Sequence, residues 1–341
     1  MAKAVVWVGT PFILNFKDPM QEVFQPLVKE GFEVRLDECR GHMPEADVIK
    51  RLEDVTAAIA GAEPYTEKVF ANAPYLQLVA RAGVGINNVD LPAATAKGIV
   101  VTNGAGTNSL SVAEHFFGLL LTCCRRIGWL DKNIRTGLWR EIQPPMRPLN
   151  GMTLGILGFG NIGKQVAKRA VAFDMKVIAN DIAPDHKRAA ELGVEFVSKA
   201  ELARRSDFLT CHVPLTPLTR HIINRDMLKL MKPDAFVFNT SRGPVFDLDA
   251  VADALKGGAI RGAGIDVFPE EPPDYSHPIF SLENAILTPH LGGRGEDAIR
   301  NTLHHAVQCV LDFFKGQRPS TVVNPEVYEV LDRGGVKRGR A

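Results

Sequence analysis

Four side chains able to do acid–base or anion chemistry come shortly after three apolar stretches that are typical of buried strands. They are Arg242 after residues 235–239, Asp266 and Glu271 after residues 262–265, and His290 after residues 285–287. The carboxyl ends of parallel strands meet at one edge of a sheet, where open α/β sheets bind their ligands. An arginine, a carboxylate and an imidazole are therefore expected to converge there.

Together these groups are sufficient for hydride transfer between a nicotinamide and a 2-oxo or 2-hydroxy acid. The rigid guanidinium of Arg242 can grip a carboxylate and polarise the neighbouring carbonyl. His290 can exchange the proton, because an imidazole titrates near neutral pH. A carboxylate on the far ring nitrogen would fix the tautomer and raise the imidazole pKa, and either Glu271 or Asp266 would serve.

Each residue also has a plainer interpretation when it is taken alone. Arg242 could form a structural ion pair, His290 could be a loop residue bonded to the backbone, and Glu270 and Glu271 could be solvated charges. His304 and His305 are better interpreted as packing or solvent-facing residues. The placement of the four groups after three successive strands favours the chemical interpretation.

A glycine-rich turn predicts the cofactor site. Residues 152–157 form an apolar stretch that runs into Gly158, Gly160 and Gly163 and then into a helical pattern. The first glycine permits the tight turn, the second lets a pyrophosphate approach the backbone, and the third lets the helix pack closely on the strand. Asp181 ends the next strand, where its carboxylate can bind both ribose hydroxyls and would repel a 2′-phosphate. With no Arg or Lys at residues 182–184, NAD is favoured over NADP.

Composition excludes several classes of protein. The 341 residues, 45% of them apolar, are enough for two domains with sizeable cores. A net charge of +1 gives no reason to expect nucleic acid or a membrane as partner, and the basic tail at 336–341 is expected to fray. The longest apolar run, 115–124, is too short to cross a bilayer. The five cysteines form no Cys-x-x-Cys pair, which suits a reducing cytoplasm and argues against disulfides or a metal site. They are Cys39, Cys123, Cys124, Cys211 and Cys309.

Strands that alternate with helical patterns predict an α/β protein with two parallel sheets. The first series of strands is expected at 4–8, 33–36, 57–60, 76–80 and 100–102. The second is expected around Gly155 and at 176–180, 208–212, 235–239, 262–265 and 285–287. Residues 109–136 predict one long apolar helix that is too hydrophobic for a surface location. Such a helix commonly buries its apolar face against another subunit or domain, so we expect a homodimer. An amphipathic helix at 296–315 and an extended stretch at 319–325 are expected to return to the first domain.

Seven stretches in fixed order, covering nearly the whole chain, make it similar to the D-isomer-specific 2-hydroxyacid dehydrogenases. Within that family the chain most resembles the D-3-phosphoglycerate dehydrogenase branch. The stretches are 81–90, 108–114, 158–163, 212–216, 239–243, 266–272 and 288–293. The resemblance implies two Rossmann-like domains with a cleft between them. A discontinuous, flavodoxin-like substrate domain would comprise 1–103 and 295–341, and a doubly wound NAD-binding domain 104–294. Hinges are expected near 104–106 and 292–295.

The resemblance also implies roles for particular residues. Arg242 would hold the substrate, His290 would be the acid/base and Glu271 its partner, with Asp266 near the nicotinamide. Backbone amides of Gly83, Val84 and Gly85 would receive the substrate carboxylate, in a loop that is a plausible anion nest. The cofactor residues would be Thr107, Val112, Gly158, Gly160, Asn161, Ile162, Gly163, Asp181, His212, Pro214, Thr219, Thr240, Ser241, Asp266 and His290, with Asn108 beside them.

Departures from the family pattern bear on the substrate. The phosphoglycerate branch carries an arginine after the third strand, whereas residues 58–66 offer Glu63, which would repel a phosphate. Arg81, or an arginine near Trp139 of a partner subunit, could compensate. Arg294 replaces a usual small residue and could reach an anionic substrate or pair with Glu296 or Asp297.

The sequence thus predicts a cytoplasmic, homodimeric, NAD-dependent dehydrogenase of small 2-hydroxy acids. Two alternatives stay open. One is an NAD-gated interaction protein with the same fold, and the other is an enzyme that acts on another small anion such as formate or phosphite.

Overall fold

The structure is a computed structural model that describes residues 4–37, 43–140 and 144–334. Cys39 and the basic tail at 336–341 lie outside the described residues. The chain divides into two compact units. Unit 1 comprises Met1–Asn108 and Gly295–Ala341, and unit 2 comprises Ser109–Arg294.

Unit 1 is built on a parallel five-stranded sheet. Its strands are β1 (Val5–Val8), β2 (Glu33–Leu36), β3 (Ala57–Ala60), β4 (Leu78–Arg81) and β5 (Val100–Thr102). Their order across the sheet is β2-β1-β3-β4-β5, the flavodoxin-like arrangement. Every residue of β1, β3 and β5 is buried, because helices cover both faces of such a sheet and select continuous apolar runs.

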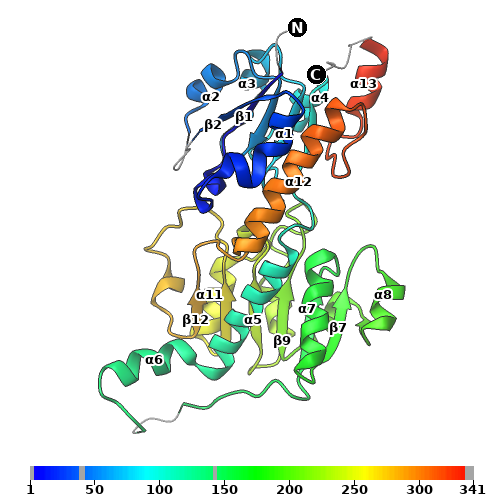
Figure 1. Ribbon diagram of the computed structural model, residues 1–341. Coiled ribbons are helices and arrows are strands. Elements are labelled where there is room, and N and C mark those ends of the chain that lie inside the picture. Colours follow the sequence, from blue (N-terminus) through cyan, green and yellow to red (C-terminus); the bar gives the residue numbers. More distant parts are fainter. Residues whose placement is uncertain (1–3, 38–42, 141–143, 335–341) are drawn as a thin grey trace. The chain divides into compact units, whose positions relative to one another are not determined.

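The helices of unit 1 come from both parts of its chain. They are α1 (Gln25–Lys29), α2 (Glu45–Arg51), α3 (Glu67–Ala71), α4 (Leu91–Ala96), α12 (Glu296–Phe314) and α13 (Val327–Gly334). Leu303, Val307 and Val310 of α12 pack in the same core cluster as Val6, Ile59 and Leu78. In Figure 1, the orange α12 accordingly lies beside the blue elements of this unit.

The stretch after α12 also completes unit 1. Val322 pairs with Thr102 in an antiparallel bridge, and the Val323 N–H donates to the Val101 carbonyl at 2.9 Å. The buried Asn324 accepts a hydrogen bond from the Val101 N–H through Oδ1 at 2.9 Å. These bonds satisfy the backbone N–H and carbonyl of Val101 at the edge strand β5.

Unit 2 contains a parallel seven-stranded sheet. Its strands are β6 (Thr153–Leu157), β7 (Lys176–Asn180), β8 (Glu195–Phe196), β9 (Phe208–Cys211), β10 (Phe236–Asn239), β11 (Gly262–Ile265) and β12 (Ala285–Leu287). The order β12-β11-β10-β9-β6-β7-β8 is that of a doubly wound dinucleotide fold with an additional edge strand. Its strand order reverses between β6 and β9, and such a switch point is where ligands bind.

Helices cover both faces of the second sheet. They are α5 (Ser109–Arg125), α7 (Asn161–Ala172), α8 (His186–Glu191), α9 (Lys199–Arg205), α10 (Arg225–Lys229) and α11 (Leu248–Lys256). A further helix, α6 (Ile127–Arg135), follows α5. Leu154 and Ile156 of β6 pack with α5 and α7, whereas Leu157 packs with α9, α10 and α11. This alternation along a strand creates two cores, one on each face.

The prediction of one helix over 109–136 is wrong. Arg126 has φ 55°, in the left-handed region, and separates α5 from α6. An L-residue in that conformation cannot continue a right-handed helix, and neither glycine nor proline marks the break. Phe116 and Leu120 of α5 are fully buried, whereas α6 buries none of its residues. Figure 1 shows α6 projecting from the end of α5, away from the sheet of unit 2.

The described part of the chain contains neither a candidate membrane-spanning helix nor a candidate metal site. None of its helices is both long and apolar enough to cross a membrane. Within the same ranges, no group of three or more His, Cys, Asp or Glu residues is placed to hold a metal ion.

Candidate active site

His290 follows β12 and is fixed through both its ring and its backbone. Its Nδ1 atom lies 2.6 Å from Oε2 of Glu271. Its N–H donates to the Asp266 carbonyl at 2.7 Å. With φ 55°, the residue adopts a left-handed conformation that L-amino acids rarely take and that clusters at functional sites. Because Nδ1 is engaged with Glu271, Nε2 is the ring atom left to exchange a proton with a bound molecule.

Glu271 is held as a carboxylate. Its second oxygen, Oε1, accepts a hydrogen bond from the Phe268 N–H at 3.1 Å. Burial by itself would raise the pKa of Glu271, but the bonds from His290 and Phe268, together with the charges of His290 and Arg242, hold that pKa below its usual value. The carboxylate thereby fixes the orientation of the His290 ring through Nδ1.

Arg242 lies on the turn that follows β10. Asn239 donates through Nδ2 to the Arg242 carbonyl at 2.9 Å, and Arg242 Nη1 donates to the Ser241 carbonyl at 2.6 Å. Burial lowers the pKa of Arg242, while the nearby charge of Glu271 acts in the opposite direction. A partly desolvated guanidinium binds an anion more strongly than a fully hydrated one.

A close backbone approach joins the Arg242 turn to the Glu271 loop. A Cβ atom added to Gly243 would lie 1.9 Å from the Phe268 carbonyl carbon. Only glycine fits this crossing, which brings the loops after β10 and β11 into contact. The Arg242 turn thus abuts the segment whose Phe268 N–H binds Glu271.

Asp266 is buried, and its carboxylate accepts hydrogen bonds from Thr288 and from two backbone N–H groups, not from the His290 ring. Its Oδ1 accepts from Thr288 Oγ1 at 2.6 Å and from the Leu291 N–H at 3.1 Å, and its Oδ2 accepts from the Gly292 N–H at 2.9 Å. Burial would raise the pKa of Asp266, yet the hydrogen bonds, including one from His115, hold it below the usual value. Of the two carboxylates that the sequence left open, Glu271 is the one that contacts the His290 ring.

The glycine turn after β6 combines two tight packing points and one open position. Gly158 has φ 97°, and a Cβ there would lie 2.8 Å from the His212 backbone. A Cβ on Gly163 would lie 2.3 Å from the Gly158 carbonyl oxygen. A Cβ on Gly160, by contrast, would meet no protein atom within 4 Å, so protein packing does not explain this glycine. Asn161 and Ile162 begin α7 directly after it, which suits a phosphate at the helix start.

Asp181 follows β7 and turns back toward this loop. Its Oδ2 accepts from the Phe159 N–H at 2.6 Å and its Oδ1 from the Ala183 N–H at 2.8 Å. The next residue, Ile182, is 98% exposed. The carboxylate therefore lies against the turn that is expected to hold the pyrophosphate.

Two further predicted cofactor residues of unit 2 carry polar atoms that the described residues leave unsatisfied. They are Nδ1 of His212 and Oγ1 of Thr240, both buried. Burial lowers the pKa of His212 to about 3, so its ring is neutral at physiological pH. Unsatisfied buried polar atoms are costly, and two of them after neighbouring strands fit a polar ligand such as a dinucleotide.

The other predicted cofactor residues are placed as follows. Thr219 Oγ1 donates to the Pro214 carbonyl at 2.6 Å, closing the loop after β9. Ser241 Oγ donates to Asn239 Oδ1 at 2.8 Å, and Val112 is buried on α5. Thr107 belongs to unit 1, where its hydroxyl lies 2.7 Å from that of Thr302. Unit 1 also contains Asn108, whose Oδ1 is buried without a partner among the described residues.

The predicted carboxylate loop lies after β4 in unit 1. The Gly83 N–H donates to the Arg81 carbonyl at 2.9 Å, and the Val84 carbonyl accepts from Asn103 Nδ2 at 2.8 Å. Arg81 Nη1 donates to the Ala82 carbonyl at 3.0 Å. The Gly83 amide is thus used within its own turn, and the substrate role of Gly83, Val84 and Gly85 stays a prediction.

A doubly wound sheet with a glycine turn, a strand-end aspartate and a His–Glu pair defines an NAD-dependent oxidoreductase. The family described as "D-isomer specific 2-hydroxyacid dehydrogenase, NAD binding domain" matches residues 117–292. The chain belongs to the D-isomer-specific 2-hydroxyacid dehydrogenases. It is accordingly an enzyme that acts on a CH–OH group, and its cofactor is NAD.

Individual relatives cover nearly the whole chain. The glyoxylate reductase of Pyrococcus furiosus is 38% identical over 316 residues, which make up 90% of this chain and 94% of that protein. The D-3-phosphoglycerate dehydrogenase of Methanocaldococcus jannaschii is 38% identical over 309 residues, 90% of this chain and 58% of that protein. A crystal structure of D-lactate dehydrogenase from Aquifex aeolicus, complexed with NAD and lactic acid, matches with a TM-score of 0.80 and 28% identity. That match covers 94% of this chain and 99% of the other.

Sequence reasoning missed two residues of helix α5, one of which contacts Asp266 and the other the loop after His290. His115 Nε2 lies 3.2 Å from Asp266 Oδ1, and Ser111 Oγ donates to the Gly292 carbonyl at 2.8 Å. The available signal was two polar residues, spaced i and i+4, on a helix that is mostly apolar.

Proposed function

We propose that this enzyme uses NADH to reduce a small, unphosphorylated 2-oxo acid, of the size of glyoxylate or hydroxypyruvate, to the D-2-hydroxy acid. The observation that carries the proposal is the 2.6 Å pair of Glu271 and His290 on loops that also bring Arg242 close. This set supplies a carboxylate clamp and a proton donor at one edge of the sheet.

Each residue has a defined task in the reaction. NADH supplies the hydride, which is added to the carbonyl carbon of the 2-oxo acid. Arg242 binds the substrate carboxylate through its guanidinium and polarises the adjacent carbonyl. His290 gives the proton on Nε2 to the carbonyl oxygen, while the Glu271 carboxylate holds the ring through Nδ1. Solvent then returns a proton to His290, so one 2-oxo acid, one NADH and one proton give one hydroxy acid and NAD.

The segment after β3 supports an unphosphorylated substrate. It contains no arginine, and its carboxylate, Glu63, is buried. Glu63 Oε1 accepts from the Gly61 N–H at 2.8 Å and from the Tyr65 hydroxyl at 3.1 Å, and burial raises its pKa. This segment therefore offers a phosphate no positive charge. The glyoxylate reductase relative agrees with this preference, and 3-phosphoglycerate is the competing substrate that the phosphoglycerate dehydrogenase relative suggests.

We also propose a preference for NADH over NADPH. The Asp181 carboxylate lies beside the glycine turn, and residues 182–184 provide no cation that could neutralise a 2′-phosphate.

The direct test is NADH oxidation by the purified protein with a panel of 2-oxo acids. Glyoxylate and hydroxypyruvate are expected to turn over with higher kcat/KM than phosphohydroxypyruvate, and NADPH is expected to replace NADH poorly. A clear preference for phosphohydroxypyruvate would overturn the substrate proposal. Tight NADH binding without turnover of any 2-oxo acid would instead favour an interaction protein or an enzyme of another small anion.

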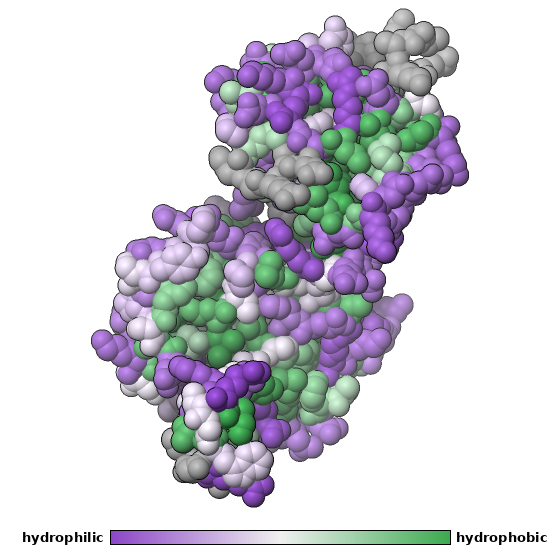
Figure 2. Space-filling view, turned by 60° about the vertical axis from the view of Figure 1, so that its left-hand side comes forward, coloured by the Kyte–Doolittle hydropathy of each residue, from purple (hydrophilic) through white to green (hydrophobic). Residues whose placement is uncertain are grey.

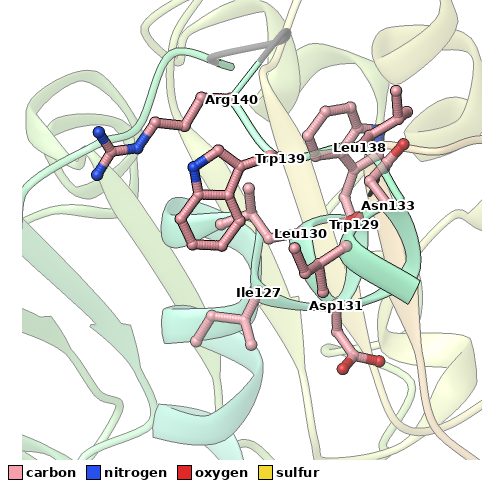
Figure 3. Close-up of a pocket in the computed structure, with 9 residues that line it drawn as sticks. Ile127, Trp129, Leu130, Asp131, Asn133, Leu138, Trp139 and Arg140 are labelled. Atoms are coloured by element: carbon pink, nitrogen blue, oxygen red, sulfur yellow. Dashed lines mark hydrogen bonds between the residues drawn. The ribbon is translucent and has the colours of Figure 1, made fainter. Parts of the chain in front are cut away.

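We further propose a homodimer formed through α6. Residues of α6 and the segment after it line an open pocket of about 400 Å³, and none of Arg242, Glu271 and His290 contributes to it. In Figure 3, Ile127, Leu130 and Trp139 gather on one side of this pocket. Figure 2 shows apolar side chains at the surface at the bottom of the view, where α6 lies. An exposed apolar surface of this kind is typical of a protein–protein interface.

The free thiols Cys123, Cys124, Cys211 and Cys309 further support a reducing, cytoplasmic location.

A further inference from the structure

Helix α5 contacts the loop that carries His290 at two points. Ser111 Oγ donates to the Gly292 carbonyl at 2.8 Å, and His115 Nε2 lies 3.2 Å from Asp266 Oδ1 and 2.9 Å from Thr288 Oγ1. Ser111 and His115 are four residues apart and therefore share one face of the helix. His115 contacts Asp266 and Thr288, so any effect on the His290 ring is indirect.

The direction of the hydrogen bonds fixes the state of the His115 ring. Thr288 has a single hydroxyl proton, which it donates to Asp266 Oδ1 at 2.6 Å. Its oxygen must therefore accept from His115, so Nε2 carries a proton. This N–H is shared between the hydroxyl oxygen of Thr288 and Oδ1 of Asp266.

Asp266 also binds the backbone of His290 and of the two residues that follow it. Its carbonyl accepts from the His290 N–H at 2.7 Å, and its carboxylate accepts from Leu291 and Gly292 at 3.1 and 2.9 Å. The backbone at Gly292 packs closely against both side chains. A Cβ on Gly292 would lie 2.9 Å from Asp266 Oδ2 and 3.2 Å from His115 Cδ2.

We infer that His115 is a positioning residue: by donating from Nε2 it orients the Asp266 carboxylate and thereby holds the loop at 290–292 so that His290 faces the substrate. The inference rests on the proposed function of His290 as the proton donor. A small displacement of a reacting group costs much of the rate, about tenfold to a hundredfold for a shift near 1 Å.

The test compares three variants. His115→Leu keeps the bulk of the side chain and removes the donor, whereas His115→Gln retains an N–H at a similar reach. His277→Leu is the matched control, since His277 pairs with Asp249 at 3.1 Å elsewhere in unit 2. We expect His115→Leu to lower kcat about tenfold to a hundredfold, with little change in the KM for the 2-oxo acid. His115→Gln and His277→Leu are expected to keep most of kcat.

Two results would overturn the inference. In one, His115→Gln loses as much kcat as His115→Leu, which would mean that the N–H donor at residue 115 does not determine kcat. In the other, His115→Leu and His277→Leu lose activity to the same degree and in step with their melting temperatures, so the loss is merely structural.

A readout that needs no turnover separates this inference from the proposed function. The ¹H–¹³C signal of the His290 ring, assigned with His290→Asn, is expected to shift in His115→Leu and to return to its position in His115→Gln. An unshifted signal in His115→Leu overturns the positioning role even if the enzyme is active. A wild-type protein inactive on every 2-oxo acid overturns the proposed function, while the His290 signal still decides the role of His115.

Discussion

The His290 imidazole is bound by a carboxylate at one ring nitrogen, and its backbone N–H is bound by a carbonyl. Glu271 fixes the ring through Nδ1, and Asp266 fixes the main chain. The two acids thus contact different parts of the residue: Glu271 contacts the ring and Asp266 contacts the main chain. The two carboxylates therefore make different contacts and are not interchangeable.

Replacement of His290 tests the proton donor. His290→Ala is expected to bind NADH as tightly as wild type and to lose about 10²- to 10⁴-fold in kcat, the usual contribution of a general acid or base. Steady-state kinetics and NADH fluorescence titration measure the two quantities. The control is His304→Ala, on the exposed side of α12. Survival of turnover in His290→Ala would mean that the proton comes from another group.

Replacement of Glu271 tests the contact at the ring. Glu271→Gln puts a neutral amide in place of the carboxylate that holds Nδ1 of His290, so kcat is expected to fall about tenfold to a hundredfold while NADH binds as in wild type. Steady-state kinetics and NADH fluorescence titration measure the two quantities. Glu270→Gln, at the exposed neighbouring acid, is expected to keep the wild-type kcat. An unchanged kcat in Glu271→Gln would contradict the assignment.

The same carboxylate makes stability depend on pH. The pKa of Glu271 is lower in the folded protein than its usual value, so the carboxylate stabilises the fold above the unfolded pKa of about 4.3. That contribution is lost as the pH falls through the folded pKa. The stability difference between wild type and Glu271→Gln should therefore shrink on acidification.

At the scale of elements, the site depends on how the ends of β10, β11 and β12 meet. Gly243→Ala places a methyl group at the crossing with Phe268, and overpacking of this kind costs about 1–3 kcal/mol or more. We expect reduced stability in denaturant unfolding and reduced kcat/KM, because the Arg242 turn must move. Gly118→Ala, in the exposed middle of α5 with no atom within 4 Å, should instead stabilise by about 0.5–1 kcal/mol. An unaltered Gly243→Ala enzyme would show that the crossing can relax.

The sequence predicted those elements whose physical pattern is strong. The apolar runs at 57–60 and 262–265 are strands with the predicted bounds, because strands buried on both faces must be apolar throughout. The less buried strands at 33–36, 176–180 and 285–287 also have the predicted bounds. The short edge strand β8 was missed, since two residues, one of them exposed, carry no periodicity. The break at Arg126 was missed because a left-handed residue other than glycine leaves no mark in the sequence.

The site was predictable to the extent that topology alone determines it. Strand order brings the segments of Arg242, Glu271 and His290 to one edge of the sheet, and that order follows from the alternating pattern. The division of labour between Glu271 and Asp266 depends on which backbone groups each oxygen reaches, and spacing does not encode this. His115 was invisible for the same reason, since its contacts join residues more than 150 positions apart.

For the whole molecule, the exposed surface of α6 predicts how copies of the chain associate. Ile127→Glu is expected to convert a dimer into a monomer, because a carboxylate buried in an apolar interface without a partner is costly. Sedimentation equilibrium gives the mass directly. Tyr75→Glu, at an exposed tyrosine of unit 1, is the control and should leave the dimer intact. A wild-type chain that is monomeric at micromolar concentration would exclude this interface.

Unit 1 draws its core from two segments separated by the whole of unit 2. Leu303, Val307 and Val310 of α12 fill the same cluster as Val6 and Ile59, and Asn324 bonds to the backbone of β5. During synthesis on a ribosome, the first five strands therefore emerge long before the helix that covers them. The emerging chain must carry an open apolar sheet while unit 2 folds behind it, and chaperones have their longest opportunity to bind during that interval.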